Sequence, residues 1–237
     1  MDKIHNLQTR TPVGEHSVLP LTYRHTAFSI KQKNVCNASN GRTLCAPTKY
    51  EFLLDFLKEK LPCGKNLVAI DGKSGSGKSS LADLMKSEFD CNIFHMDDFF
   101  LPPPMRTSER LREIGGNVDY ERFNDEIIKN SRQDKPFSYH IYDCKNDVFV
   151  DSPLIQPKKI NIVEGVYSLH SLYRDVYDFK IYLTVSDDAQ KARILKRNGE
   201  YMLNRYINEW IPLENAYFEH HDFENECDLV IDTTENM

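Results

Sequence analysis

The sequence lacks the features that direct a protein to nucleic acid or to a membrane. Acidic residues outnumber basic ones, with 36 Asp and Glu against 30 Lys and Arg, and the net charge of −6 disfavours bulk electrostatic binding to nucleic acid. No apolar run approaches the roughly 20 residues that span a bilayer, and the polar stretch Met1–Arg10 does not resemble a secretory signal. We therefore expect a cytoplasmic protein with no nucleic acid and no membrane partner.

The cysteines are equally unlike a metal or redox site. No two of them stand in a C-x-x-C pair, so a zinc site or a catalytic dithiol is disfavoured, and we expect free thiols in a reducing compartment. The six cysteines are Cys36, Cys45, Cys63, Cys91, Cys144 and Cys227. A chain of 237 residues is long enough for one α/β domain with a full core and an extension.

Two parts of the chain differ in their patterning. Residues 1–46 mix short polar and apolar pieces around proline and glycine breaks, which fits either a tail or a small hairpin. Residues 47–237 form the expected domain, which begins with a helical pattern near Thr48 that ends at Pro62 and Gly64.

Within that domain, short apolar runs alternate with helical patterns. The runs typical of buried parallel strands are 67–70, 92–96, 160–163, 180–185 and 229–231. The helical patterns are 79–89, 120–130, 187–197 capped by Ser186 or Asp187, and 201–220 with a kink or break at Pro212. Segments 137–142 and 147–150 indicate a small hairpin. This alternation predicts an α/β three-layer sandwich with a central parallel sheet.

A phosphate-binding motif follows the first of these strands. Residues Gly72–Ser79 read Gly-Lys-Ser-Gly-Ser-Gly-Lys-Ser and match the P-loop pattern G-x-x-x-x-G-K-[ST] in full. Such glycines let backbone N–H groups wrap a phosphate, and the following helix N-terminus adds partial positive charge. Lys78 can bridge the β- and γ-phosphates of ATP, and the Ser79 hydroxyl can ligate Mg²⁺. The candidate nucleotide-binding residues are Gly72, Ser74, Gly75, Ser76, Gly77, Lys78, Ser79 and Ser80.

Acidic residues follow two of the other predicted strands. Asp97 and Asp98 come at the end of 92–96, and Glu164 follows 160–163. Ligands gather at the carboxyl ends of parallel strands. A carboxylate there can accept a hydroxyl proton or hold a metal ion, whereas the alternative is a solvated loop acid. The candidate metal ligands are Ser79, Asp97 and Glu164.

Basic residues cluster after the strand at 180–185. Arg193, Lys196 and Arg197 share one face of a predicted helix, and Arg205 follows. Such a group could close over a phosphate and neutralise the charge that develops during its transfer. The alternative is an ordinary solvated helix face.

The order of these features resembles the uridine kinase / phosphoribulokinase family of P-loop kinases, especially its short bacterial uridine-kinase-like members. The likeness covers residues 67–233. Besides the P-loop, it is carried by Met-Asp-Asp-Phe-Phe at 96–100, Gly-Gly-Asn-Val-Asp-Tyr-Glu-Arg-Phe at 115–123, Ile-Tyr-Asp at 141–143, Val-Glu-Gly-Val-Tyr at 163–167 and Asp-Leu-Val-Ile-Asp at 228–232. The fold implied is a P-loop NTPase sandwich of the nucleoside-kinase kind.

The resemblance also implies roles for individual residues. Asp97 resembles the catalytic base that accepts the proton of the substrate 5′-hydroxyl, and Glu164 looks like the second acid that anchors the metal. Asp119 is similar to the aspartate that holds the ribose hydroxyls. Tyr142 stands at the place of the tyrosine in the base pocket.

The chain departs from the family pattern around the acceptor. Arg193 and Lys196 look like the catalytic cations of the family's lid, but Asn198–Glu200 stands near the place of an expected Arg-Gly-Arg-Asp stretch. Asp147 and Phe149 stand where the family has a pocket His and Arg. Because a few placed polar groups decide base specificity, these changes leave the acceptor open.

The expected function is ATP- and Mg²⁺-dependent transfer of the γ-phosphoryl group to a hydroxyl of a small metabolite. A nucleoside such as uridine or cytidine, phosphorylated at its 5′-hydroxyl, is the first candidate. Another riboside, pantothenate or a sugar phosphate is the alternative acceptor, and a P-loop NTPase or nucleotide sensor without an acceptor is the alternative class. The sequence leaves open whether the chain forms a homo-oligomer.

Overall fold

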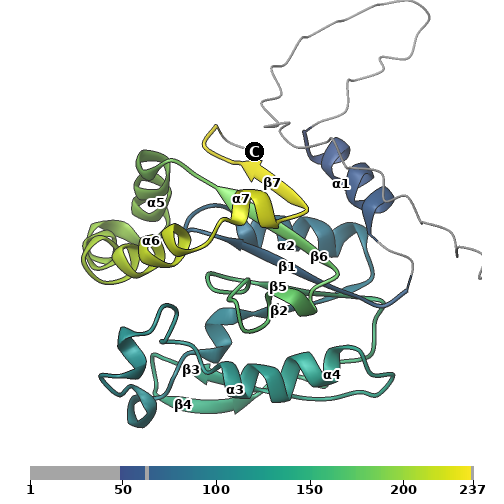
Figure 1. Cartoon of the computed structure of the whole chain (residues 1–237), viewed down its shortest axis with the longest axis horizontal. Helices are drawn as coiled ribbons and strands as arrows, with labels where there is room; N and C mark the ends of the chain where they lie inside the picture. The colour runs from purple at the N-terminus through teal and green to yellow at the C-terminus, as the bar shows by residue number, and fades with distance from the viewer. Residues whose placement is uncertain (1–48, 62–63, 236–237) are drawn as a thin grey trace, which may run out of the picture.

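A five-stranded parallel sheet forms the centre of the computed structural model, which describes residues 49–61 and 64–235 (Figure 1). Its strand order is β2-β5-β1-β6-β7, and every neighbouring pair is parallel. The strands are β1 (Asn66–Gly72), β2 (Cys91–His95), β5 (Ile160–Glu164), β6 (Phe179–Thr184) and β7 (Leu229–Asp232). The predicted α/β fold with a central parallel sheet is therefore confirmed, while the expected tail or hairpin over 1–46 lies outside the described residues.

Strand β1 shows why the sheet is covered on both faces. All its residues are buried, and alternate side chains enter two separate hydrophobic clusters. Val68 and Ile70 join one cluster, whereas Leu67 and Ala69 join the other. A strand buried on both faces reads as a continuous apolar run, which is the pattern of the sequence here.

Helices cover the two faces of the sheet (Figure 1). Helices α1 (Lys49–Lys60) and α2 (Lys78–Glu88) cover one face, to which they contribute Leu57, Leu81 and Met85. The other face packs against a helical segment formed by α3 (Tyr120–Phe123), a π-helical turn η4 (Asn124–Ile128) and α4 (Lys129–Ser131). Residues of α6 (Ile211–His220) and α7 (Phe223–Glu226) join the same cluster.

A small antiparallel hairpin lies beside α3 and η4. It consists of β3 (His140–Asp143) and β4 (Val148–Asp151), close to the predicted segments. The Asp143 side chain accepts hydrogen bonds from the backbone N–H groups of Lys145 and Asn146 and so closes the turn. Asp147 has a positive φ of 56°, a conformation that aspartate tolerates better than most residues.

The segment after β6 is more irregular than two plain helices. Helix α5 (Asp187–Arg205) is capped by the Ser186 hydroxyl, which accepts from the N–H of Ala189, and is interrupted at Gly199, where φ is 78°. A π-helical turn η6 (Tyr206–Trp210) then leads into α6. Pro212 lies in the first turn of α6, where its missing N–H costs nothing, so the irregular turn falls just before the proline.

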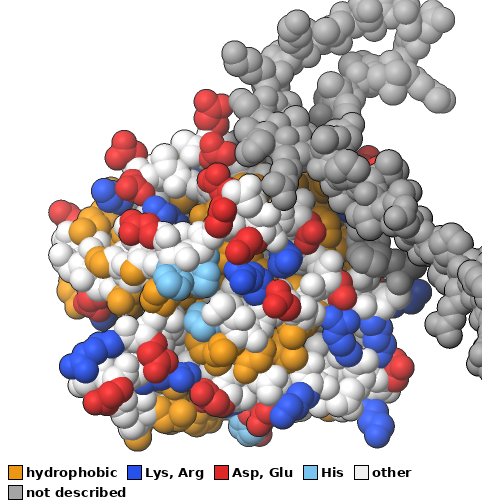
Figure 2. Space-filling model, in the orientation of Figure 1, with side chains coloured by type: hydrophobic (Ala, Val, Ile, Leu, Met, Phe, Trp, Pro, Cys, Tyr) orange, Lys and Arg blue, Asp and Glu red, His pale blue; other side chains and the backbone are white. Residues whose placement is uncertain are grey.

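Short 3₁₀ helices form the remaining connections. They are η1 (Met96–Phe99), η2 (Pro103–Met105), η3 (Arg110–Arg112) and η5 (Arg174–Val176). Met96, expected at the end of a strand, begins η1 instead. Among the described cysteines, Cys91, Cys144 and Cys227 are free thiols. In the ranges that the structure covers, no helix combines the length and hydropathy that a membrane crossing requires. On the face shown in Figure 2, acidic and basic side chains are interspersed.

Candidate active site

The P-loop joins the carboxyl end of β1 to α2. Gly75 and Gly77 have φ values of 77° and 96°, which only glycine adopts without strain. The Lys78 ammonium donates to the backbone carbonyls of Gly72, at 2.7 Å, and Lys73, at 3.0 Å. The lysine is therefore held against the loop at the N-terminus of α2, in the arrangement that suits the phosphates of a nucleotide.

Ser79 and Glu164, two of the predicted metal ligands, are in direct contact. The Ser79 hydroxyl donates to Oε1 of Glu164 at 3.2 Å, and Glu164 is 5% exposed. The contact arises because β5 lies beside β1, with Glu164 in register with Ile70. An alcohol and a carboxylate, both oxygen donors, suit Mg²⁺.

His95 joins this pair and was not among the residues singled out in the sequence. Its Nδ1 lies 2.6 Å from Oε1 of Glu164, and this hydrogen bond raises the pKa of the imidazole. His95 ends β2 and is in register with Glu164 on β5. Correct alignment of the two strand ends would have identified it.

Asp97 lies in η1, close to the same carboxylate. Its side chain is exposed to solvent, yet surrounding protein atoms desolvate the carboxyl enough to raise its pKa, an effect that the charge of Lys78 opposes. Gly165, which follows β5, allows η1 to lie close to the end of that strand, since a Cβ at this position would lie 2.6 Å from the Cβ of Met96. No hydrogen bond or ion pair from the described residues engages the Asp97 carboxylate.

The neighbouring acid, Asp98, is held differently. The hydroxyl of Tyr139 donates to Oδ2 of Asp98 at 2.9 Å, and burial raises the pKa of the Asp98 carboxyl. Of the two consecutive acids, Asp97 is thus the one that is open to a ligand.

Asp119 is buried at the start of α3. Its carboxylate accepts from the backbone N–H of Arg122 at 3.0 Å and from Nε of Arg122 at 3.3 Å. Arg122 also donates to the carbonyls of Asp98, at 2.8 Å, and His140, and its guanidinium stacks 4.4 Å from the Phe99 ring. Arg122 therefore connects η1, α3 and β3. This connecting role could not be recognised in the sequence. The proposed contact of Asp119 with ribose hydroxyls stays a prediction.

Tyr142 on β3 is buried and hydrogen-bonded to Asp147, one of the two residues that depart from the family pattern. Its hydroxyl donates to the Asp147 carboxylate, which raises the pKa of Tyr142 to about 12. The Phe149 ring lies 5.3 Å from the Tyr142 ring, and the Arg106 guanidinium lies 5.9 Å from it. Both residues that depart from the family pattern therefore contact the predicted base-pocket tyrosine.

The cations of α5 are not equivalent. Arg193 donates to the carbonyl of Gly75 and to the side chain of Thr233, both at 3.1 Å, so its guanidinium holds the P-loop. Lys196 is exposed and has no ion pair within the described part of the chain. Arg197 is among the charges that lower the pKa of Asp97, which brings it, rather than Lys196, near the candidate base. The predicted catalytic action of Arg193 and Lys196 stays a prediction.

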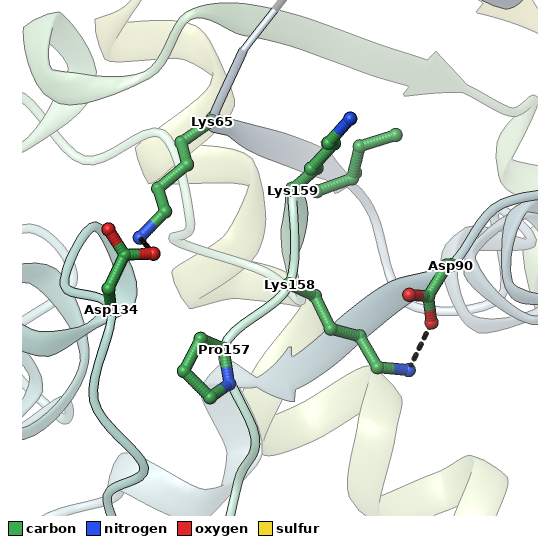
Figure 3. Close-up of a pocket in the computed structure, with 7 residues that line it drawn as sticks. Lys65, Asp90, Asp134, Pro157, Lys158 and Lys159 are labelled. Carbon is green, nitrogen blue, oxygen red and sulfur yellow. Dashed lines mark ion pairs between the residues drawn. The ribbon is translucent and has the colours of Figure 1, made fainter.

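A separate cavity of about 460 Å³ lies at the amino ends of β1 and β5, at the edge of the sheet opposite the P-loop (Figure 3). Two of its three lysines are paired with acids, since Lys65 pairs with Asp134 at 2.5 Å and Lys158 pairs with Asp90 at 2.8 Å, and Lys159 is the third. The chemistry that the sequence predicts lies at the other edge.

A parallel sheet with this loop at its carboxyl edge, joined to strand-end acids, defines the class of P-loop nucleotide-binding proteins. The chain belongs to the Phosphoribulokinase / Uridine kinase family, whose model matches residues 67–202. Membership of this kinase family supports a phosphotransferase, and the family implies the use of ATP.

Individual relatives share modest sequence identity with the chain. It is similar to the uridine kinase of Streptococcus pneumoniae (strain Hungary19A-6), with 25% identity over 170 residues that cover 65% of this chain and 79% of the relative. The structure of a possible uridine kinase from Bacillus stearothermophilus superposes with a TM-score of 0.62 and 21% identity, covering 77% of this chain and 97% of that one. A "putative fructose transport system kinase" from Silicibacter sp. TM1040 gives a TM-score of 0.59 and 20% identity, with coverage of 78% and 99%. These two superpositions support the fold.

Proposed function

We propose that the protein transfers the γ-phosphoryl group of ATP to a hydroxyl group of a small metabolite, with Mg²⁺ as cofactor. The observation that carries the proposal is the position of Asp97, whose free carboxylate is open to solvent and lies within the electrostatic influence of Lys78 on the P-loop. Phosphoryl transfer to an alcohol requires a general base beside the loop that binds the triphosphate.

The nucleotide side of the site fits a triphosphate with its metal. The backbone of Gly72–Ser79 and the start of α2 would hold the phosphates, and Lys78 would leave its carbonyl partners to bridge the β- and γ-phosphates. Ser79 and Glu164 would hold Mg²⁺, directly or through water, and Asp97 borders the same place. When bound, the ion neutralises charge on the β- and γ-phosphates.

On the acceptor side, Asp97 orients the substrate hydroxyl and takes its proton. The hydroxyl oxygen forms a bond to the γ-phosphorus while the bond from that phosphorus to the β–γ bridging oxygen breaks, and ADP leaves. Lys78, Arg193, Lys196 and Arg197 are the cations available to stabilise the charge that develops. Catalysis then consists of positioning and electrostatics.

A nucleoside is the first candidate acceptor, supported by the family and by the relatives that carry the name uridine kinase. Asp119 and Tyr142 would bind its ribose and base. The Asp147 carboxylate and the Phe149 ring beside Tyr142 change the pocket chemistry, which keeps another riboside, pantothenate or a sugar phosphate as the alternative acceptor. A neighbour named as a fructose transport kinase is in keeping with a sugar.

Product analysis separates these possibilities. The protein with ATP and Mg²⁺ is incubated with a panel of nucleosides, pantothenate, sugars and sugar phosphates, and product masses are read. A mass gain of one phosphoryl group on uridine or cytidine supports the first candidate. ADP release without any phosphorylated acceptor would instead support a P-loop NTPase or sensor.

The substitution Asp97→Asn tests the base directly. We expect ATP affinity to stay within a few-fold while transfer falls by about 10²–10⁴-fold, the usual contribution of a general base. The matched control is Asp98→Asn, which keeps an oxygen acceptor for the Tyr139 hydroxyl and is expected to lose less than about tenfold. Normal transfer by the Asp97→Asn variant would show that the base is assigned wrongly.

A further inference from the structure

Glu214 on α6 is a buried carboxylate that contacts the P-loop. Its Oε2 accepts from the backbone N–H of Ser74 at 2.9 Å, and the Ser74 hydroxyl donates to its Oε1. The side-chain amide of Gln190 lies 3.3 Å from Oε2. Glu214 is 4% exposed, and within residues 49–61 and 64–235 no lysine, arginine or histidine forms an ion pair with it.

Such a carboxylate is costly unless several donors satisfy it. Ser74 and Gln190 supply those donors, and both come from elements that border the nucleotide site. A neutral or apolar side chain would fill this position with a smaller desolvation cost. The presence of a carboxylate therefore indicates that Ser74, the third residue of the P-loop, has to be held in a defined position.

A second contact from α6 reaches the beginning of the same loop. Tyr217, which lies on the face of α6 that carries Glu214, donates to Oδ2 of Asp71 at 2.8 Å. Asp71 immediately precedes Gly72, and Tyr217 is fully buried. Helix α6 therefore holds the P-loop at two points.

Helix α5 also contacts the loop. Arg193 donates to the carbonyl of Gly75 at 3.1 Å, and a Cβ on Gly75 would lie 3.3 Å from the carbonyl oxygen of Gln190. Ser74 and Gly75 are thus clasped between α5 and α6, with Gln190 and Glu214 joining the two helices.

Residues 198–210, here called the bridging segment, connect these two anchoring helices. The segment contains the break at Gly199 and the π-helical turn η6. Trp210, the single tryptophan of the chain, lies at its end, 4.6 Å from the Tyr206 ring and 4.8 Å from the Arg205 guanidinium. Arg197, which influences Asp97, precedes the segment directly.

We propose that Glu214 is a positioning residue that couples the P-loop to the bridging segment. When a nucleotide contacts Ser74 and Gly75, Glu214 transmits this contact to α6 and changes the position of α6 relative to α5. The basic residues that precede the bridging segment or lie within it are thereby placed over the transferring phosphate. The inference rests on the proposed function only in that the P-loop binds a nucleotide.

The fluorescence of Trp210 reports this coupling without an acceptor. Wild-type protein is titrated with ADP–Mg²⁺ and with ATP–Mg²⁺, and a saturable change in emission is expected. In Glu214→Ala the amplitude falls to less than half while nucleotide affinity, measured by calorimetry, changes by no more than a few-fold. The matched control is Glu219→Ala, an exposed residue of the same helix, which should behave as wild type.

Two further variants keep the test decisive. Glu214→Gln retains the side-chain volume, so it serves if the alanine variant does not fold. Ser74→Ala removes the hydroxyl contact alone, and its effect should not add to that of Glu214→Ala, because the two residues act through one contact. Where transfer is measurable, Glu214→Ala lowers kcat about tenfold with little change in the KM for ATP.

Several results would overturn the coupling. These are an unchanged emission in wild-type protein saturated with nucleotide, a full amplitude in both Glu214 variants, and additive effects of the Ser74 and Glu214 substitutions. A wild-type enzyme that binds ATP with an emission change but phosphorylates no acceptor refutes the proposed function alone and leaves the coupling standing.

Discussion

The Ser79 hydroxyl donates a hydrogen bond to Oε1 of Glu164 across 3.2 Å, which joins the last residue of the P-loop motif to the end of the adjacent strand β5. The same carboxylate oxygen lies 2.6 Å from Nδ1 of His95 at the end of β2. Three strand or loop ends that are distant in sequence therefore meet at one buried carboxylate. An ion bound by Ser79 and Glu164 would have to share or displace the contact with His95.

Glu164→Gln is expected to weaken the binding of Mg²⁺ rather than the binding of the nucleotide itself. The amide retains one oxygen but loses the charge, so the Mg²⁺ concentration at half-maximal activity should rise about 10–100-fold. Activity is measured against Mg²⁺ concentration at saturating ATP, with Glu219→Gln as control. An unchanged Mg²⁺ requirement would exclude Glu164 as a metal ligand.

Asp71 is expected to make stability depend on pH. It is fully buried, and burial raises its pKa from 3.8 to about 6, against the hydrogen bonds from Leu169 and Tyr217. The folded state binds the Asp71 proton more tightly than the unfolded state does. The stabilisation of the folded state that results is therefore fully present below pH 3.8 and is lost as pH rises through 6.

The measurement is chemical unfolding of the wild type and of Asp71→Asn at a series of pH values. The free energy of unfolding of the wild type, relative to that of the variant, should increase by about 1 kcal/mol from pH 7 to pH 5 and by more toward pH 4. A difference that is constant across this range would show that Asp71 does not titrate as its burial implies.

Most of the fold and part of the site could be predicted because their signals are local in sequence. The P-loop is a contiguous motif, and Glu164 and Asp97 follow apolar runs that end at the same edge of the sheet. The boundaries of the central strands differ from those predicted by only a residue or two, as at Met96, because an apolar side chain can equally be buried in a 3₁₀ turn, whereas the first hairpin strand begins three residues later than predicted.

The contacts that hold the site in place could not be predicted in the same way. Ser74 and Glu214 are 140 residues apart, and neither the spacing nor the type of Glu214 distinguishes it from the exposed Glu219 on the same helix. Arg122 also looks like a surface residue in the sequence, and only the packing of α3 against η1 and β3 shows that its guanidinium bonds to Asp119 and to the carbonyls of Asp98 and His140.

Arg197 is expected to affect the protonation state of Asp97, the proposed base, more than Lys196 does. The guanidinium of Arg197 is among the charges that lower the pKa of Asp97. Arg197→Ala should therefore raise that pKa and move the acidic limb of the pH–rate profile to higher pH, because transfer needs the carboxylate form. At neutral pH we expect turnover to fall about tenfold or more.

Lys196→Ala is the matched comparison, since Lys196 lies on the same turn of α5 and is exposed like Arg197, but it is not among the main influences on the pKa of Asp97. Its pH–rate profile should overlay that of the wild type. If instead the Lys196 variant shifts the acidic limb and the Arg197 variant does not, the sequence-based assignment of Lys196 to the lid is the better one.

Arg122 is expected to position the acceptor side of the site. Its guanidinium bonds to Asp119, to the carbonyl of Asp98 and to that of His140, while it stacks on Phe99. A lysine cannot reproduce this planar arrangement, so Arg122→Lys should lower the free energy of unfolding by about 1–3 kcal/mol and raise the KM for the acceptor without changing nucleotide affinity. Unfolding, acceptor KM and ATP binding are compared with those of Arg112→Lys, an exposed arginine in η3. A loss of ATP affinity in Arg122→Lys equal to the rise in acceptor KM would mean that Arg122 supports the whole fold rather than the η1–α3–β3 junction beside Asp97.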